Sequence, residues 1–78
     1  MEIKIYTTPT CSWCVKLKEW LKKKKYAFQE LDVTEEDEYS DEMLAKSGQL
    51  AVPVIDIDGK IIVGFHEQKI EEAIAKAK

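Results

Sequence analysis

The sequence predicts an α/β fold, in which one mixed sheet of four strands is covered by three helices in the order β-α-β-α-β-β-α. Three observations predict it. Residues 2–6 alternate between charged and apolar side chains, residues 12–25 repeat apolar residues at helical spacing, and Asp58-Gly59 separates two apolar stretches. These patterns are typical of a half-buried strand, an amphipathic helix and a two-residue hairpin. A chain of 78 residues has room for a single domain over residues 1–78.

The first half of the sequence predicts a strand, a helix and a second strand. In the strand at residues 2–6, Ile3 and Ile5 face one side, and Tyr6 shares the other side with charged residues. The helix from Ser12 to about Lys25 has an apolar face made by Trp13, Leu17, Trp20 and Leu21, with Cys14 beside it. Residues 26–33 alternate again with one slip in phase. Since a strand-helix-strand unit crosses over right-handedly between parallel strands, we expect these two strands to be parallel.

A second helix is predicted beside the acidic run at residues 35–38. Thr34 followed by Asp37 resembles a capping box, and acidic side chains are favourable at a helix N-terminus. The helix should bury Tyr39, Met43 and Leu44. We expect it to end near Ser47-Gly48, because glycine is the usual residue just past a helix end.

The C-terminal part of the sequence predicts a hairpin followed by a last helix. Two apolar stretches in "VPVIDIDGKIIV" flank Asp58-Gly59, which favours two antiparallel strands joined by a tight turn. The last helix places Ile70, Ile74 and Ala77 on one face, with Glu67 in its first turn and Lys76 and Lys78 in its last.

Composition excludes several classes of function. The net charge of −3 argues against a nucleic-acid partner, because phosphate binding needs a surplus of basic residues on one surface. The N-terminal residues alternate and so do not resemble a signal peptide. The longest apolar run, residues 50–55, contains a proline and is far shorter than the ~20 residues of a membrane helix. We therefore expect a cytoplasmic protein without a membrane partner, and a monomer.

Both cysteines lie in the stretch "TPTCSWCVKL", three positions apart, in the loop where the first strand leads into the first helix. In a reducing compartment such a pair is more often catalytic, redox-sensing or metal-binding than a permanent disulfide. Helix N–H groups stabilise a thiolate and lower its pKa, so Cys11, at the helix start, is the expected nucleophile. Cys14, one turn further and nearer the core, is placed to attack a mixed disulfide on Cys11. Lys16 and Lys18 either add positive potential or point into solvent.

Other interpretations of the reactive residues are weaker. A zinc site needs four ligands, and this chain has two cysteines and the distant His66, so metal binding would require a dimer. Two inert buried thiols do not explain the spacing at a helix start. The lysine run at residues 22–25 is either an anion site or, more simply, a solvated helix end. His66 is either a surface residue or part of a groove beside the cysteines.

With the first strand, "CSWC", "AVPVIDIDG" and "VGF" in this order, the chain resembles the glutaredoxins, and in particular the short bacterial and archaeal glutaredoxin-like proteins that include the ribonucleotide-reductase redoxins. The resemblance implies a thioredoxin fold, with Cys11 attacking and Cys14 resolving. It implies a cis Val52-Pro53 bond, where the Val52 backbone pairs with an incoming peptide or glutathione. Trp13 would then form a partly exposed aromatic wall, unless it simply covers the core.

Two departures from this family affect the expected substrate. Dithiol glutaredoxins usually carry a lysine where this chain has Thr8, and Gly-Gly followed by Asp where it has Gly64, Phe65 and His66. Charged contacts to glutathione are therefore reduced. The resemblance implies a substrate site that comprises Thr8, Trp13, Val52, Pro53, Gly64, Phe65 and His66.

From these features we expect a thiol-disulfide oxidoreductase that holds no cofactor or metal and reduces protein disulfides. Its electron source would be thioredoxin reductase or glutathione. Glutathione mixed disulfides, with glutathione as co-substrate, are the alternative substrates. The competing class is a dimer that binds a metal or iron-sulfur cluster through Cys11.

Overall fold

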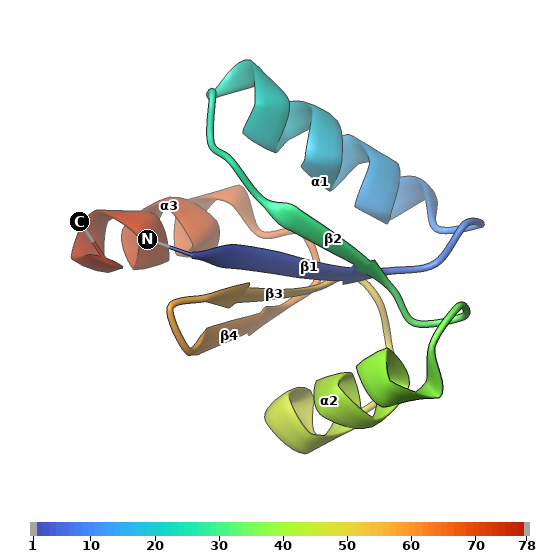
Figure 1. Cartoon of the computed structure of the whole chain (residues 1–78). Coiled ribbons are helices and arrows are strands. Elements are labelled where there is room, and N and C mark those ends of the chain that lie inside the picture. Colours follow the sequence, from blue (N-terminus) through green and yellow to red (C-terminus); the bar gives the residue numbers. More distant parts are fainter. Residues whose placement is uncertain (1, 78) are drawn as a thin grey trace.

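The computed structural model describes residues 2–77, and the elements follow one another in the predicted order (Figure 1). They are β1 (Ile3–Thr7), α1 (Ser12–Lys23), β2 (Gln29–Asp32), α2 (Asp37–Ser47), β3 (Val54–Ile57), β4 (Lys60–Val63) and α3 (Glu67–Ala77). The strands form one sheet in the order β2-β1-β3-β4. β1 and β2 are parallel, whereas β1–β3 and β3–β4 are antiparallel. This mixed sheet with helices on both faces is a thioredoxin fold, as predicted.

The two faces of the sheet are covered differently. Helices α1 and α3 cover one face and α2 covers the other (Figure 1). The buried residues under α1 and α3 are Ile3, Ile5, Leu17, Leu21, Ile55, Ile57, Ile62, Ile70, Ala73 and Ile74. Under α2 the buried set is smaller and consists of Tyr6, Leu31, Met43 and Val54. The alternating side chains of β1 therefore point into two different cores. The expectation that Tyr6 lies on a polar side of the strand was wrong.

The start of α2 differs from the sequence prediction. The helix begins at Asp37, its N-cap Glu36 makes no side-chain capping bond, and Asp37 and Glu38 occupy the first turn. Thr34 instead donates from its backbone N–H and its hydroxyl to the Asp32 carboxylate, at 2.8 and 2.6 Å. These hydrogen bonds lower the pKa of Asp32. The predicted capping box at Thr34 and Asp37 was therefore wrong, because Thr34 hydrogen-bonds to Asp32 in the turn after β2 and does not cap the helix.

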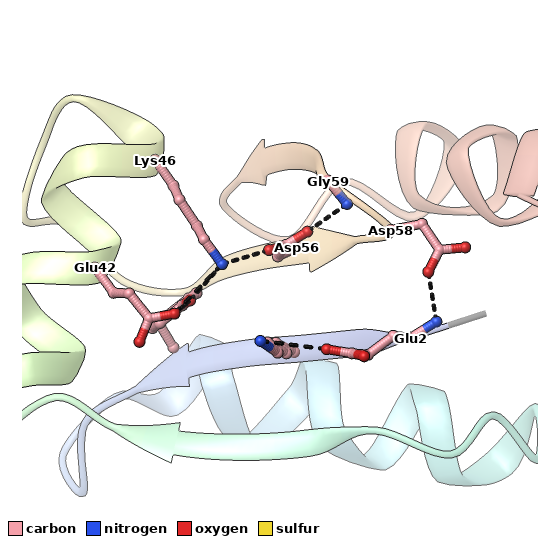
Figure 2. A network of polar contacts seen from close by, with 8 residues as sticks. Glu2, Glu42, Lys46, Asp56, Asp58 and Gly59 are labelled. Atoms are coloured by element: carbon pink, nitrogen blue, oxygen red, sulfur yellow. Dashed lines mark hydrogen bonds and ion pairs between the residues drawn. The ribbon is translucent and has the colours of Figure 1, made fainter.

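Helix α2 is anchored to the sheet by polar contacts among Tyr6, Glu42, Lys46 and Asp56, which we call the α2 anchor. Figure 2 shows Glu42 and Lys46 on α2 beside Asp56 on β3. The Lys46 ammonium donates to the Asp56 carboxylate at 2.6 Å and to the Tyr6 hydroxyl at 3.0 Å. It also pairs with Glu42 at 3.5 Å, while the Tyr6 hydroxyl donates to Glu42 at 3.1 Å. Leu44, expected in the core, is 44% exposed because it lies off the side of α2 that meets the sheet.

The pKa values of the anchor reflect these contacts. Burial alone would raise the pKa of Asp56, but the Lys46 ammonium and the Gly59 N–H outweigh it and lower that pKa. The Asp56 and Tyr6 side chains, by hydrogen bonding, raise the pKa of Lys46. Burial raises the pKa of the Tyr6 hydroxyl, against the opposing effect of Lys46.

The predicted turn at Asp58-Gly59 and the predicted end of α2 are both confirmed. Asp58 and Gly59 have φ values of 49° and 94°, as a two-residue hairpin loop requires, and the Gly59 N–H donates to the Asp56 carboxylate at 2.7 Å. Gly48 closes α2 with a left-handed φ of 76°.

The remaining boundaries follow the predictions except at β2. β2 is shorter than the predicted residues 26–33, because Tyr26 and Phe28 pack against the larger core before the strand begins. Helix α1 ends at Lys23, with Lys22 and Lys23 in its last turn, and α3 carries Glu67 in its first turn and Lys76 in its last. Lys78 lies outside the described residues. None of the helices within residues 2–77 has the length and apolar character needed to span a membrane.

Candidate active site

Cys11 and Cys14 lie where the chain passes from β1 into α1. Cys11 is the N-cap of α1 in extended backbone conformation, and Cys14 belongs to the first turn of that helix. The two residues form a disulfide, with their Cα atoms 5.2 Å apart. The loop is held from behind, since the Cys11 N–H donates to the Thr8 carbonyl at 3.3 Å. The predicted position of Cys11, outside the carboxyl end of the first strand, is confirmed.

The two sulfurs have different surroundings. Cys14 is 1% exposed and forms part of the core, whereas Cys11 is half-buried. The Cys14 backbone N–H donates to the Cys11 sulfur at 3.1 Å. Once the disulfide is reduced, this donor and the dipole of α1 stabilise negative charge on Cys11. Cys11 is therefore the more accessible of the two sulfurs.

A cavity of about 330 Å³ gathers most of the remaining predicted site residues, which come from three separate segments of the chain. Its lining consists of Trp13, Val52, Pro53, Gly64, Phe65 and His66. The Val52-Pro53 bond is cis, as the family resemblance implied. The Gly64 N–H donates to the Pro53 carbonyl at 2.8 Å and joins two of the segments. Thr8 does not line this cavity and contacts the site through its carbonyl.

Trp13 forms an exposed wall of the cavity. It is 56% exposed, so the prediction that it belongs to the core-facing stripe of α1 was wrong. Its ring lies 6.4 Å from the Phe65 ring, and the Phe65 ring lies 6.0 Å from that of Trp20, which packs against the larger core. Aromatic pairs at such distances attract one another. Trp13 is thus held in place through Phe65 while much of its ring stays exposed.

The lysines near the site take different roles. The Lys16 ammonium lies 4.6 Å from the centroid of the Trp13 ring, a cation–π contact that the i, i+3 spacing could have predicted. Lys18 is paired with Glu30 at 2.5 Å. Lys24, in the run predicted to be a helix end, pairs with Glu71.

His66 belongs to the cavity, although the sequence left it open between the surface and a groove. A Cβ added to Gly64 would lie 3.3 Å from the His66 Nε2 atom, and the φ of Gly64 is +86°. Only glycine adopts this conformation readily and leaves that space. The "VGF" motif therefore brings the imidazole close to the Pro53 loop.

Metal ligands are not grouped at this site. Within residues 2–77, no set of three or more His, Cys, Asp or Glu side chains is arranged to hold a metal ion.

The fold and the disulfide at the start of α1 define a thiol-disulfide oxidoreductase of the thioredoxin-fold class. Comparison with known proteins gives the family, since the Glutaredoxin family model matches residues 3–62. The chain belongs to the glutaredoxin family.

Similar proteins span almost the whole chain. A glutaredoxin-like 8.6 kDa protein from the rubredoxin operon of Clostridium pasteurianum is 50% identical over 95% of this chain and 99% of its own length. Glutaredoxin 3 of Escherichia coli K12 is 39% identical over 80% of this chain and 75% of its own. The crystal structure of a glutaredoxin from Archaeoglobus fulgidus matches with a TM-score of 0.84 and 27% identity, covering 94% of this chain and 85% of that one.

Proposed function

We propose that this protein is a cytoplasmic, monomeric dithiol electron donor that reduces protein disulfides. In the first step the Cys11 thiolate attacks one sulfur of the substrate disulfide. A mixed disulfide forms, and the other substrate sulfur leaves as a thiolate. The Cys14 thiolate then attacks the Cys11 sulfur, which gives the Cys11–Cys14 disulfide and releases the second substrate thiolate. Two electrons pass from the protein to the substrate, whose thiolates take up protons from water.

The observation that carries this proposal is the difference in exposure between the two sulfurs. Cys11 is half-buried and receives a hydrogen bond from the Cys14 N–H, whereas Cys14 is 1% exposed. The buried Cys14 thiol cannot reach a bulky disulfide, but it is close enough to the Cys11 sulfur to form a bond with it. This arrangement supports the order of attack and resolution.

The cavity supports a polypeptide as the substrate. None of its lining residues is Lys, Asp or Glu, and apart from the His66 imidazole and the Trp13 indole N–H its polar groups belong to the backbone. Glutathione carries carboxylates at both ends, and each charge-assisted hydrogen bond that the cavity fails to make would be worth about 1.5–3 kcal/mol. A polypeptide needs no such contacts, because the Val52 backbone can pair with an extended chain. Trp13, Phe65 and Pro53 offer apolar surface beside it.

Glutathione mixed disulfides are the second candidate substrates. The 39% identity to glutaredoxin 3 favours this alternative, as does the His66 imidazole, which could contact a carboxylate. The two candidates imply different electron sources, namely thioredoxin reductase for the first and glutathione for the second.

A coupled assay separates these routes. The oxidised protein would be mixed with NADPH and thioredoxin reductase, and separately with NADPH, glutathione and glutathione reductase. We expect faster NADPH consumption with thioredoxin reductase, using a protein disulfide such as insulin as acceptor. Turnover by the glutathione route alone would overturn the substrate preference. Failure of both routes, with a reducible Cys11–Cys14 disulfide, would overturn the role as an electron donor.

A further inference from the structure

A second cavity lies away from the cysteines, along the outer strand of the sheet. Its volume is about 460 Å³. We call it the β4 groove, and it is lined by Lys60, Ile61, Ile62, Val63, Lys69, Glu72, Ala73 and Lys76. One wall is the whole of β4, and the other is a face of α3, since residues 69, 72, 73 and 76 follow helical spacing. Figure 1 shows α3 beside the β3–β4 hairpin.

The charge of the β4 groove is opposite to that of the chain. Three lysines and one glutamate line it, although the net charge of the protein is −3. No ion pair involves Lys60, Lys69 or Lys76 in the part of the chain that the structure describes. Lys60 and Lys76 also line a neighbouring cavity at the hairpin end, together with Asp58, whose carboxylate accepts a hydrogen bond from the Glu2 N–H. Unpaired lysines around a concave surface favour an anionic occupant.

The backbone of β4 offers a second means of binding. β4 is the last strand in the order β2-β1-β3-β4, and on its outer side no strand within residues 2–77 pairs with it. An exposed edge can add an extended peptide as a further strand. A single lysine would be enough to prevent pairing between copies of the chain. Three lysines from two elements, beside the apolar side chain of Ile62, exceed what that protection needs.

The β4 groove also continues toward the reactive disulfide. Val63 ends the groove, and the next residue, Gly64, lines the cavity beside Trp13 and Pro53. The four residues of β4 give room for roughly three to four residues of an extended chain. A polypeptide that presents its disulfide to Cys11 can therefore place a neighbouring segment along β4.

We propose that the β4 groove binds an acidic, extended segment of the protein whose disulfide is reduced at Cys11, and so selects substrates by charge. The inference rests on the proposed function, because the groove acts on the same substrate. Acidic side chains of the segment pair with Lys60, Lys69 and Lys76, and its backbone pairs with the free edge of β4. Glu72 lowers the positive charge in the middle of the groove, so a peptide with separated carboxylates fits better than a compact polyanion.

Single-turnover kinetics test this proposal without any choice of reductase. Two peptides of equal length would carry one cysteine as a mixed disulfide with thionitrobenzoate, one with Asp and Glu flanking the cysteine and the other with Asn and Gln. For the reduced protein we expect the second-order rate constant to be about tenfold higher with the acidic peptide at low salt, since opposite charges accelerate association. In the triple variant Lys60→Gln, Lys69→Gln, Lys76→Gln the preference should disappear.

A matched control has the same change in net charge at another place. The triple variant Lys22→Gln, Lys23→Gln, Lys25→Gln alters exposed lysines around the C-terminal end of α1 and should keep the preference. Equal loss in both variants, or equal rates for both peptides with the unaltered protein, would overturn the proposal. Amide shifts in an NMR titration with an acidic peptide that carries serine for cysteine should map to residues 60–63, and shifts confined to other strands would also overturn it.

Neutral hydroxyethyl disulfide separates this proposal from the function it rests on. Its reduction should be unchanged in both triple variants. If the unaltered protein reduces it but shows no preference for the acidic peptide, only the β4 groove proposal fails. If the protein reduces neither this compound nor the peptides, the proposed function fails.

Discussion

The active-site cavity and the α2 anchor reverse the usual distribution of polar and apolar groups in opposite ways. At the cavity, Trp13 is 56% exposed although its ring is largely apolar. In the anchor, Asp56 is only 7% exposed although its side chain is charged. Asp56 has partners for its charge, namely Lys46 and the Gly59 N–H. Trp13 lacks cover over much of its ring. From this comparison we expect the anchor to contribute mainly to stability and the cavity mainly to binding.

Because of this difference, we expect substitutions in the two regions to affect different properties of the protein. A change in the α2 anchor should alter the free energy of unfolding with little effect on disulfide reduction. A change at the cavity or the cysteines should do the reverse. The largest expected effect is on the reaction itself.

Replacing the nucleophile should abolish activity. We expect Cys11→Ser to lower the rate of disulfide reduction by at least about a thousandfold, because a hydroxyl does not replace a thiolate in this chemistry. Cys14→Ser should instead accumulate a mixed disulfide on Cys11, since the resolving thiol is gone. Mass spectrometry after mixing with a peptide disulfide measures both outcomes. Equal trapping by the two variants would contradict the division of roles.

Removing the buried carboxylate should mainly affect folding. Asp56→Ala leaves the Gly59 N–H without its acceptor and removes the shortest contact of the Lys46 ammonium, which keeps Tyr6 and Glu42, and we expect the free energy of unfolding to fall by about 2–3 kcal/mol. The rate with hydroxyethyl disulfide should change less than about twofold, because the anchor does not line the cavity. Urea denaturation measures the first quantity. Asp41→Ala, at an exposed position on α2, is the control and should change stability little.

Removing the exposed aromatic wall should give the opposite pattern. For Trp13→Ala we expect the KM for a peptide disulfide to rise about three- to tenfold, because apolar contact area is lost. The free energy of unfolding should fall by less than about 1 kcal/mol. Trp20→Ala, which removes a ring packed against the core, should cost more stability than Trp13→Ala. A larger stability loss for Trp13→Ala would contradict its role as a binding wall.

The smallest effect is the pH dependence of the α2 anchor. The pKa of Asp56 is lowered in the folded protein by Lys46 and the Gly59 N–H, which outweigh burial. Its stabilising contribution is therefore complete above the unfolded carboxyl pKa of about 3.9 and is lost as the pH falls through the folded value. The raised pKa of Lys46 acts at the alkaline end, where stability is lost as the pH rises past about 10.4.

Denaturation midpoints measured over both pH ranges would test this. The unaltered protein should lose stability at each end. Asp56→Asn should show a smaller dependence on acid, because the titrating group has been removed. An identical acid profile in the two proteins would show that other carboxylates determine it.

Local patterns in the sequence were enough to predict much of the fold. The Asp58-Gly59 turn, the end of α2 at Gly48 and the start of α1 beside Cys11 all depend on the conformational preferences of a few adjacent residues. The prediction at Thr34 failed for the same local reason, because Asp32 offered a nearer acceptor for its hydroxyl.

It was harder to predict which side chains face the core and which residues of different elements contact one another. The helical period placed Trp13 and Leu44 toward the core, yet both are exposed, because the sheet covers only part of each helix. Nothing in the sequence pairs Lys46 with Asp56 or Tyr6, which lie on different elements. Such contacts depend on how α2 lies across the strands.

The sequence by itself determined the reactive chemistry of this protein, because two thiols at the start of a helix need only their own backbone and each other. The tertiary structure alone decided what surrounds them. Trp13, the Val52-Pro53 loop and the Gly64–His66 segment are distant in sequence and meet only when the sheet is formed. Residues far apart in the chain cannot influence one another's conformation until packing brings them together, and so the cavity beside the cysteines depends on the whole fold.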